Sequence, residues 1–247
     1  MLEPTAAHQR YMQQAAWTAP ARRHLLAAAG LPNARGVLEV GCGTGAVLGT
    51  ITAPAGAVIV GLDIDRAALP LARQHAPDAA LTAGDAHALP YPDACFDIAF
   101  CHFVLLWVAE PAKTLAEMRR VVRPGGAVLV LAEPDYTQRI DEPAELAALG
   151  QAQTEALSAR GTDPAVGGRL PALFAAAGLQ VVDAGPLQTS CPSASTAAEE
   201  ASMLRADLSG HVPAEQLERW LAQDAAAWAA GTRKLQVPTY YALGRVS

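Results

Sequence analysis

The sequence predicts an α/β domain with a mostly parallel sheet that is covered by helices on both faces. Short apolar runs alternate with segments of helical character, which is the order of successive strand–helix–strand units. Each run is almost continuously apolar, as in strands that are buried on both faces of a parallel sheet. The chain has 247 residues, of which 51% are hydrophobic, so it can bury one large core.

Seven segments are expected as strands, and turn residues precede two of them. Pro54-Ala55-Gly56 precedes the second strand, and Arg123-Pro124-Gly125-Gly126 precedes the fifth. The third strand has the weakest apolar pattern. The expected strands are residues 36–40, 57–62, 79–83, 96–100, 127–132, 179–183 and 239–246.

Helices are expected between these strands and at the N-terminus. Thr18 is expected to cap a helix that has Pro20 in its first turn and ends at Gly30. Asp65 is expected to cap a second helix, and Pro111 to occupy the first position of a third. The expected helices are residues 5–30, a segment from a glycine-rich turn to about 52, and 65–75, 111–122, 142–159, 169–177, 197–209 and 213–230.

Charge and hydropathy narrow the classes of partner. The net charge is −6, only Lys113 and Lys234 of the 18 basic residues are lysines, and the basic residues form no run. Binding to a nucleic-acid backbone requires a clustered basic face, so no nucleic-acid partner is expected. No stretch of about 18 uncharged apolar residues occurs, and residues 1–5 do not begin a secretory signal. We therefore expect a protein of the cytoplasm without membrane contact.

Neither the cysteines nor the acids predict a metal site. Cys42, Cys95, Cys101 and Cys191 have no CxxC or zinc-ligand spacing, and we expect free thiols in a reducing compartment. No acidic pair suggests a catalytic metal, so none is expected.

The strongest motif is a glycine-rich turn at residues 39–45, between an expected strand and an expected helix. Glycines let the backbone bend sharply and let a ligand approach the main chain closely. In an open parallel sheet, ligands bind beyond the carboxyl ends of the strands where the strand order reverses. Gly41, Gly43 and Ala46 also satisfy the dinucleotide fingerprint, and Asp63 follows Gly43 by 20 residues, where a ribose-binding acid is expected. The glycine pattern alone leaves the type of nucleotide open.

Two acids sharpen this interpretation. Glu39 lies inside an apolar strand, where a buried carboxylate is costly unless it is paired. Its position suggests a charged partner, either a ligand ammonium group or a network that organises the loop. Asp85 adds a carboxylate after the third strand.

Five short motifs occur in one order and at a characteristic spacing. They are LEVGCGTG at 38–45, GLD at 61–63, GDA at 84–86, FD at 96–97 and RPGG at 123–126. Together they resemble class I S-adenosylmethionine-dependent methyltransferases, especially small-molecule enzymes similar to the quinone-biosynthesis C-methyltransferases. The resemblance is good over residues 36–135 and loose elsewhere. It implies a Rossmann-like, seven-stranded, mostly parallel sheet whose last strand is antiparallel.

The resemblance also implies that S-adenosylmethionine is the cofactor and assigns residues to the two ends of this molecule. Gly41 and Gly43 would line its methionine part, and Glu39 would hold its amino-acid end, directly or through water.

The remaining implied contacts involve the adenosine part and the cofactor amino group. Asp63 would accept hydrogen bonds from both ribose hydroxyls, which a carboxylate can do. Ile64 would pack on the adenine face, and Asp85 would accept from the adenine amino group with the Ala86 amide nearby. The backbone of Cys101 would approach the cofactor amino group.

Methyl transfer from a sulfonium is an in-line displacement that requires alignment and exclusion of water. A general base is needed only if the acceptor must lose a proton. His102 is the best candidate base because it follows the fourth strand, although it could instead pack or orient the backbone. No Asn-Pro-Pro-Tyr or Asp-Pro-Pro-Tyr follows this strand, which favours a small-molecule oxygen, carbon or other nitrogen acceptor.

The chain is expected to form one methyltransferase domain with three parts. Residues 1–30 form an N-terminal helical cap, 31–135 the cofactor-binding core, and 136–247 a C-terminal half with a helical insertion at about 197–230. Residues 10–17 could close over the cofactor or pack against the domain. The insertion could cover an acceptor pocket, form the face of a homodimer or be ordinary core.

Two other functional classes stay open from sequence. A nicotinamide-dependent oxidoreductase would bind NAD and not S-adenosylhomocysteine. A cofactor-binding protein without transferase activity would bind the cofactor and turn over no acceptor. A polyamine synthase is disfavoured because no clear set of extra acids is present.

Overall fold

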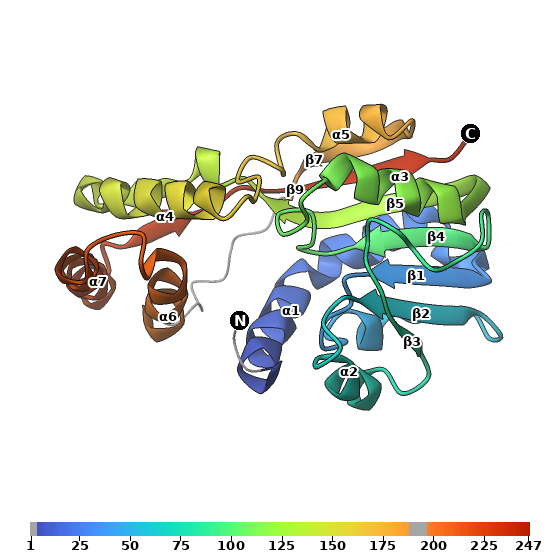
Figure 1. The fold of residues 1–247 in the computed structure, drawn as a ribbon, viewed down its shortest axis with the longest axis horizontal. Helices are drawn as coiled ribbons and strands as arrows, with labels where there is room; N and C mark the ends of the chain where they lie inside the picture. Colours follow the sequence, from blue (N-terminus) through green and yellow to red (C-terminus); the bar gives the residue numbers. More distant parts are fainter. Residues whose placement is uncertain (1–3, 188–196) are drawn as a thin grey trace.

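The computed structural model describes residues 4–187 and 197–247, and its centre is a seven-stranded sheet (Figure 1). The strand order is β3-β2-β1-β4-β5-β9-β7, and β9 alone runs antiparallel to its two neighbours. The expected fold class is therefore confirmed. The strands are β1 (Gly36–Val40), β2 (Val58–Asp63), β3 (Ala80–Ala83), β4 (Phe96–Cys101), β5 (Val122–Pro134), β7 (Gln180–Pro186) and β9 (Thr239–Arg245).

Strand β1 lies where the strand order reverses, and it is buried along its whole length. It pairs in parallel with both β2 and β4, so that Val40 lies opposite Leu62 and Cys101. The loops after β1, β2 and β4 therefore begin at one edge of the sheet. This edge is the place where open α/β sheets bind ligands.

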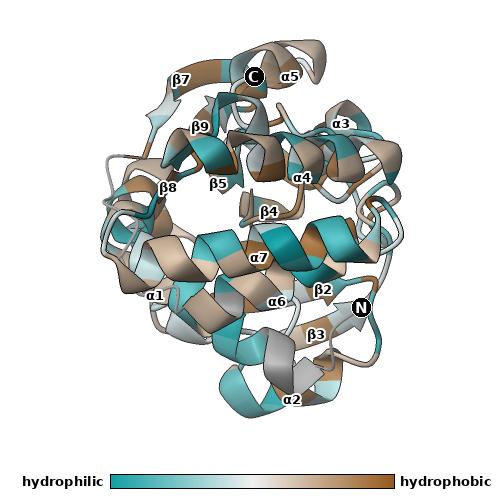
Figure 2. Cartoon of the chain, turned by 90° about the vertical axis from the view of Figure 1, so that its left-hand side faces the viewer, coloured by the Kyte–Doolittle hydropathy of each residue, from teal (hydrophilic) through white to brown (hydrophobic). Residues whose placement is uncertain are grey.

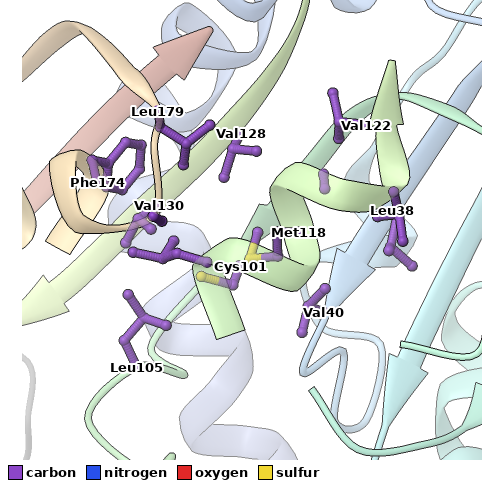
Figure 3. Close-up of a cluster of buried hydrophobic side chains, with 14 of the residues drawn as sticks. Leu38, Val40, Cys101, Leu105, Met118, Val122, Val128, Val130, Phe174 and Leu179 are labelled. Carbon is purple, nitrogen blue, oxygen red and sulfur yellow. The ribbon is translucent and has the colours of Figure 1, made fainter. Parts of the chain in front are cut away.

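Helices cover the two faces of the sheet. On one face, α3 (Pro111–Val121) and α5 (Leu170–Ala176) pack on apolar residues of β1, β4 and β5. Figure 3 shows part of this cluster, where strand residues such as Val130 meet Met118 and Phe174. On the other face, α1 (Pro4–Ala29) packs on a second cluster, which contains Val37. Because strand residues alternate between faces, Glu39 points to the α1 side with Val37.

A separate group of helices lies beyond the carboxyl ends of the strands, and we call it the helical lobe (Figure 1). It consists of α4 (Ala147–Ala159), α6 (Ala197–Leu208) and α7 (Ala214–Ala229), with the short strands β6 (Ile140–Glu142) and β8 (Lys234–Gln236). The three helices share an apolar cluster of their own. Figure 2 views this lobe from outside and shows α7 with apolar and polar residues on different sides.

The helix expected directly after the glycine-rich turn is wrong. The chain makes turns there, followed only by the 3-10 helix η2 (Leu48–Thr50). Gly45 has φ +78°. A Cβ on Gly49 would lie 2.2 Å from the carbonyl oxygen of His75, which is the last residue of α2 (Leu69–His75). This segment is therefore shaped by close contact with α2.

Two predicted helix starts are also wrong. Helix α1 continues through Pro20, and Thr18 is not its cap, because the Thr18 hydroxyl donates to the Gln14 carbonyl within the helix. The helix expected from Asp65 begins at Leu69, because Asp65 accepts a hydrogen bond from the Ala67 amide in a preceding turn.

Two further boundaries differ from expectation. Strand β5 begins at Val122, because residues 123–126 form an irregular segment between the pairs Phe96–Val122 and Ile98–Ala127. The helix expected from residue 142 begins as the 3-10 helix η4 (Ala144–Leu146), because β6 pairs with β8 first.

Two further observations concern membrane-spanning helices and free cysteines. None of the helices within the described ranges is long and apolar enough to cross a bilayer. Cys42, Cys95 and Cys101 are free, and Cys191 lies outside the described residues.

Candidate functional site

The glycine-rich turn is tied to the end of β2. The amides of Gly41 and Cys42 both donate to the Leu62 carbonyl, at 2.7 and 3.0 Å. Gly41 has φ +72°, and a Cβ on it would lie 2.4 Å from Cγ2 of Val104. Gly43 has φ +50°. Only glycine readily adopts a positive φ, and only glycine leaves room for Val104 at position 41. These two requirements explain the glycines of the motif.

Asp63 holds the turn while keeping capacity for further hydrogen bonds. Its Oδ2 accepts from the Gly43 amide at 2.6 Å, and its Oδ1 accepts from the Asp65 amide at 2.8 Å. Burial raises the pKa of Asp63, and these backbone hydrogen bonds act against that rise. Each carboxylate oxygen has a second lone pair, so Asp63 can also bind two hydroxyl groups.

Glu39 is almost completely buried, with 2% exposed surface. In the described part of the chain, its Oε2 has no hydrogen-bond partner. Burial raises the pKa of Glu39 well above its ordinary value, and Arg22 of α1 partly opposes this. The Arg22 guanidinium donates to the Ala15 carbonyl and to Thr18 and Thr50. A buried orphan oxygen is costly, and a ligand ammonium group or a bound water would satisfy it.

An exposed apolar side chain and an exposed acid follow the next two strands. Ile64 is 72% exposed directly after Asp63, and it offers an apolar surface to a planar ring. Asp85 is exposed, and its Oδ1 accepts from the amide and from Nδ1 of His87. These hydrogen bonds lower the pKa of Asp85, so it is a carboxylate at neutral pH. Ala86 packs against the core beside it.

The end of β4 contacts α1. The Cys101 side chain is fully buried, and burial raises the pKa of its thiol well above the ordinary value. His102 Nε2 lies 2.9 Å from Oγ1 of Thr18, and the His102 ring packs edge-on against Phe103. Burial lowers the pKa of His102 to about 3, and the charge of Arg22 lowers it further in the same direction. His102 is therefore neutral at pH 7 and binds a proton weakly.

The sequence analysis missed Glu133, which organises the loop after β4. Glu133 is fully buried, and it accepts from the amides of Val104, Leu105 and Leu106 at 2.7, 2.8 and 3.2 Å. Burial raises its pKa to about 7. Glu133 thereby fixes Val104, the residue that contacts Gly41. An acid after the apolar run of residues 127–132 is the same signal that identified Asp85.

Helix α1 lies across the glycine-rich turn. His8 Nδ1 is 2.7 Å from Oγ1 of Thr44. A Cβ on Gly43 would lie 3.6 Å from Cε2 of Tyr11. Further along the helix, the Trp17 ring packs on Phe103 with centroids 6.2 Å apart. The first part of α1 thus covers the turn, while Trp17 packs against the domain.

The predicted residues accordingly meet at one edge of the sheet. Glu39 in β1 can bind an ammonium group. Asp63 and Ile64 at the end of β2 can bind sugar hydroxyls and a planar ring, and Asp85 after β3 can accept a further hydrogen bond. Within the ranges that the structure describes, no group of three or more His, Cys, Asp or Glu side chains could hold a metal ion.

Comparison with known proteins agrees with this geometry. Residues 38–130 match the model of a family described as a methyltransferase domain. A relative in transposon TN4556 of Streptomyces fradiae, an uncharacterized 37.1 kDa protein, is 34% identical over 85% of this chain and 64% of its own length. A demethylmenaquinone methyltransferase of Renibacterium salmoninarum is 41% identical over 44% of this chain and 46% of its own length. The chain thus spans less than two thirds of these relatives.

A solved structure shares the fold over nearly the whole chain. It is the complex between the Haloferax volcanii Trm112 methyltransferase activator and the putative methyltransferase. This chain matches it with 20% identity and a TM-score of 0.62, over 99% of this chain and 96% of that one. The motifs, the strand order, the family match and these relatives agree, and the chain belongs to the class I S-adenosylmethionine-dependent methyltransferases.

Proposed function

We propose that this protein transfers the methyl group of S-adenosylmethionine to a small-molecule acceptor. The observation that carries the proposal is the buried, unpartnered Oε2 of Glu39 beside the glycine-rich turn. An apolar strand does not gain stability from such an oxygen, whereas a bound amino-acid group can satisfy it.

The amino-acid end of the cofactor is proposed to bind between β1 and α1. Gly41 and Gly43 would line it, because they leave the backbone accessible at the bend. Glu39 would hold the ammonium group, directly or through water. Asp63 would bind the ribose hydroxyls with the lone pairs that the Gly43 and Asp65 amides leave free.

The adenosine part is proposed to lie along the ends of β2 and β3. Ile64, which is 72% exposed, would pack on the adenine ring. Asp85 would accept from the adenine amino group with the Ala86 amide nearby. The Cys101 backbone would approach the cofactor amino group.

The cofactor supplies a methyl group that is activated by a positively charged sulfur. The contribution of this chain is to orient that group and to exclude water. Helix α1 lies over the turn, and the helical lobe stands at the same edge of the sheet (Figure 1). The proposed role of His102 as a base has little support from its surroundings, because its low pKa and its contact with Thr18 favour a role in docking α1.

A small-molecule acceptor is supported by the net charge of −6 and by the apolar helices of the lobe. We also propose that residues 1–247 form one functional domain. The homodimer and the cytoplasmic location stay predictions, which gel filtration and cell fractionation would test.

The first test is calorimetry with S-adenosylhomocysteine. Asp63→Ala should weaken binding by about 1–3 kcal/mol, because a carboxylate with several hydrogen bonds is lost. Asp78→Ala is the matched control, since Asp78 is exposed and lies just before β3. Equal affinity of wild type and Asp63→Ala would remove Asp63 from the site. Binding of NAD without S-adenosylhomocysteine would favour the oxidoreductase.

The second test addresses transfer itself. The protein is incubated with S-adenosylmethionine labelled in its methyl group and a deproteinised extract of small metabolites. A labelled product confirms transfer. Cofactor binding without any labelled product would support a binding protein that lacks transferase activity.

A further inference from the structure

Glu200, in the first turns of α6, has surroundings unlike those of the other buried acids in the helical lobe. It is 5% exposed, and within residues 4–187 and 197–247 its Oε1 has no hydrogen-bond partner. By contrast, Asp141, Asp207 and Asp224 each accept a hydrogen bond from an arginine. Glu39 and Glu200 are the two acids of the described chain that have a buried carboxylate oxygen without a partner.

Helix α6, which carries Glu200, contacts the first part of α1, the part that covers the glycine-rich turn. Met203 follows Glu200 by three residues, so the two side chains lie on one side of the helix. The Sδ of Met203 accepts a hydrogen bond from Nη2 of Arg10 in α1 at 2.7 Å. The next residue of α1, Tyr11, covers Gly43. Figure 1 accordingly shows α6 between α7 and α1 at the carboxyl edge of the sheet.

Charged groups from three elements surround Glu200. Arg139, Arg10 and Arg233 attract its carboxylate, and Asp224 repels it. The charges of Arg10, Arg139 and Glu200 also act on the pKa of Tyr136, which follows β5.

We propose that Glu200 binds a hydroxyl group of the acceptor and takes up its proton during methyl transfer. This inference rests on the proposed function and names the acceptor class. Glu200 accepts the hydrogen bond of the hydroxyl through Oε1, the oxygen that the protein leaves free. As the acceptor oxygen attacks, its O–H bond breaks and the proton passes to Glu200.

The step is balanced. A bond forms between the acceptor oxygen and the methyl carbon, and the bond from that carbon to the cofactor sulfur breaks. The electron pair of the broken bond stays on sulfur, which becomes a neutral thioether. Glu200 releases its proton to solvent when the products leave.

The charges favour a hydroxyl over an amine. Arg10 and Arg139 already supply positive charge to Glu200, so an additional ammonium group would meet repulsion. A protonated amine also lacks the lone pair that attacks the methyl carbon. A neutral hydroxyl satisfies Oε1 without adding charge. Burial raises the pKa of Glu200, which makes it a better proton acceptor than an exposed carboxylate.

The first readout separates this role from a structural one. Glu200→Gln should keep the affinity for S-adenosylhomocysteine and melt at the wild-type temperature or above it, because it removes an unpaired buried charge. Glu218→Gln is the control, since Glu218 is exposed and pairs with Arg205 at 3.0 Å. A clearly lower melting temperature for Glu200→Gln would show a structural role and overturn the assignment.

The second readout uses methyl-labelled S-adenosylmethionine with the deproteinised metabolite extract. Glu200→Gln should incorporate label about 100-fold more slowly than wild type, as expected for a lost general base, and Glu200→Asp should recover part of the rate. Hydriodic acid should release the label of the wild-type product as methyl iodide, which shows an O-methyl group.

Three outcomes would overturn the inference. They are a wild-type rate in Glu200→Gln, a partial rate that Glu200→Asp does not improve, and label bound to nitrogen or carbon. If the wild-type protein binds S-adenosylhomocysteine but produces no labelled product, the proposed methyl transfer is contradicted. The role of Glu200 in that transfer is then contradicted as well.

Discussion

The carboxyl edge of the sheet and the helical lobe both bury acids, but they satisfy them differently. In the lobe, Asp141 and Asp224 are neutralised by Arg233 at 2.8 and 2.6 Å. At the sheet edge, Asp63 and Glu133 accept mainly backbone amides, and the described structure leaves Glu39 Oε2 without a partner. The lobe uses its charges to hold its own elements together, while at the sheet edge the described residues leave part of the hydrogen-bonding capacity of Glu39 and Asp63 unused.

This difference makes unpaired oxygens informative. A buried carboxylate that a protein pairs internally serves the fold, and one that it leaves unpaired costs stability. Glu200 belongs to the lobe by position but resembles Glu39 in its missing partner. Both acids lie near arginines of α1, since Arg22 acts on Glu39 and Arg10 acts on Glu200.

The largest expected effect is in the lobe. Arg233→Met should lower the free energy of unfolding by about 3–5 kcal/mol, because it leaves Asp224 buried without the cation that it pairs with and leaves Asp141 paired with Arg139 alone. Urea unfolding measures the change. Lys234→Met is the control, because its pair with Glu142 is exposed and should contribute under about 1 kcal/mol. Similar losses in both variants would show that the buried network does not stabilise the lobe.

A smaller effect of opposite sign is expected at the sheet edge. Glu39→Gln should raise the free energy of unfolding by about 1–2 kcal/mol at pH 8, because it removes a buried charge. The pKa of Glu39 is raised in the folded chain, so its charged form destabilises the fold above the unfolded value near 4.5. The gain should therefore shrink as the pH falls from 8 to 5.

The same variant should bind S-adenosylhomocysteine more weakly, by about 1–3 kcal/mol. Urea titrations at pH 5 and 8, with calorimetry at pH 8, measure both effects. A loss of stability at pH 8 would show that Arg22 or another group already pairs with Glu39, and the contrast between the two regions would fail.

The two regions also differ in how many of their acids could be found from the sequence. The acids of the sheet edge belong to three strand ends, so Glu39 could be found inside an apolar run, and Asp63 and Asp85 could be found by their positions after such runs. Glu133 carried the same signal and was missed. The lobe network joins Asp141, Asp224 and Arg233, which come from three separate segments, and no local pattern predicts such a meeting.

The smallest expected effect concerns Ile64. Ile64→Ala should change the free energy of unfolding by less than about 0.5 kcal/mol, because the side chain is exposed. The binding free energy of the Ile64→Ala variant for S-adenosylhomocysteine should weaken by about 1 kcal/mol, because apolar contact with the adenine ring is lost. Val58→Ala, which changes an exposed residue at the opposite end of β2, should leave the affinity unchanged. Equal affinities of Ile64→Ala and wild type would remove Ile64 from the ring contact.

The sequence by itself determined the fold class, the strands and the glycine-rich turn, because strand burial and glycine conformations leave local patterns. It also determined the family through motifs within one stretch of the chain. Only the tertiary structure decided that α1 covers the turn, that His102 is half-buried beside Thr18, and that within the described residues Oε1 of Glu200 has no hydrogen-bond partner. These facts depend on contacts between distant segments, whose partners are chosen by packing and charge in three dimensions.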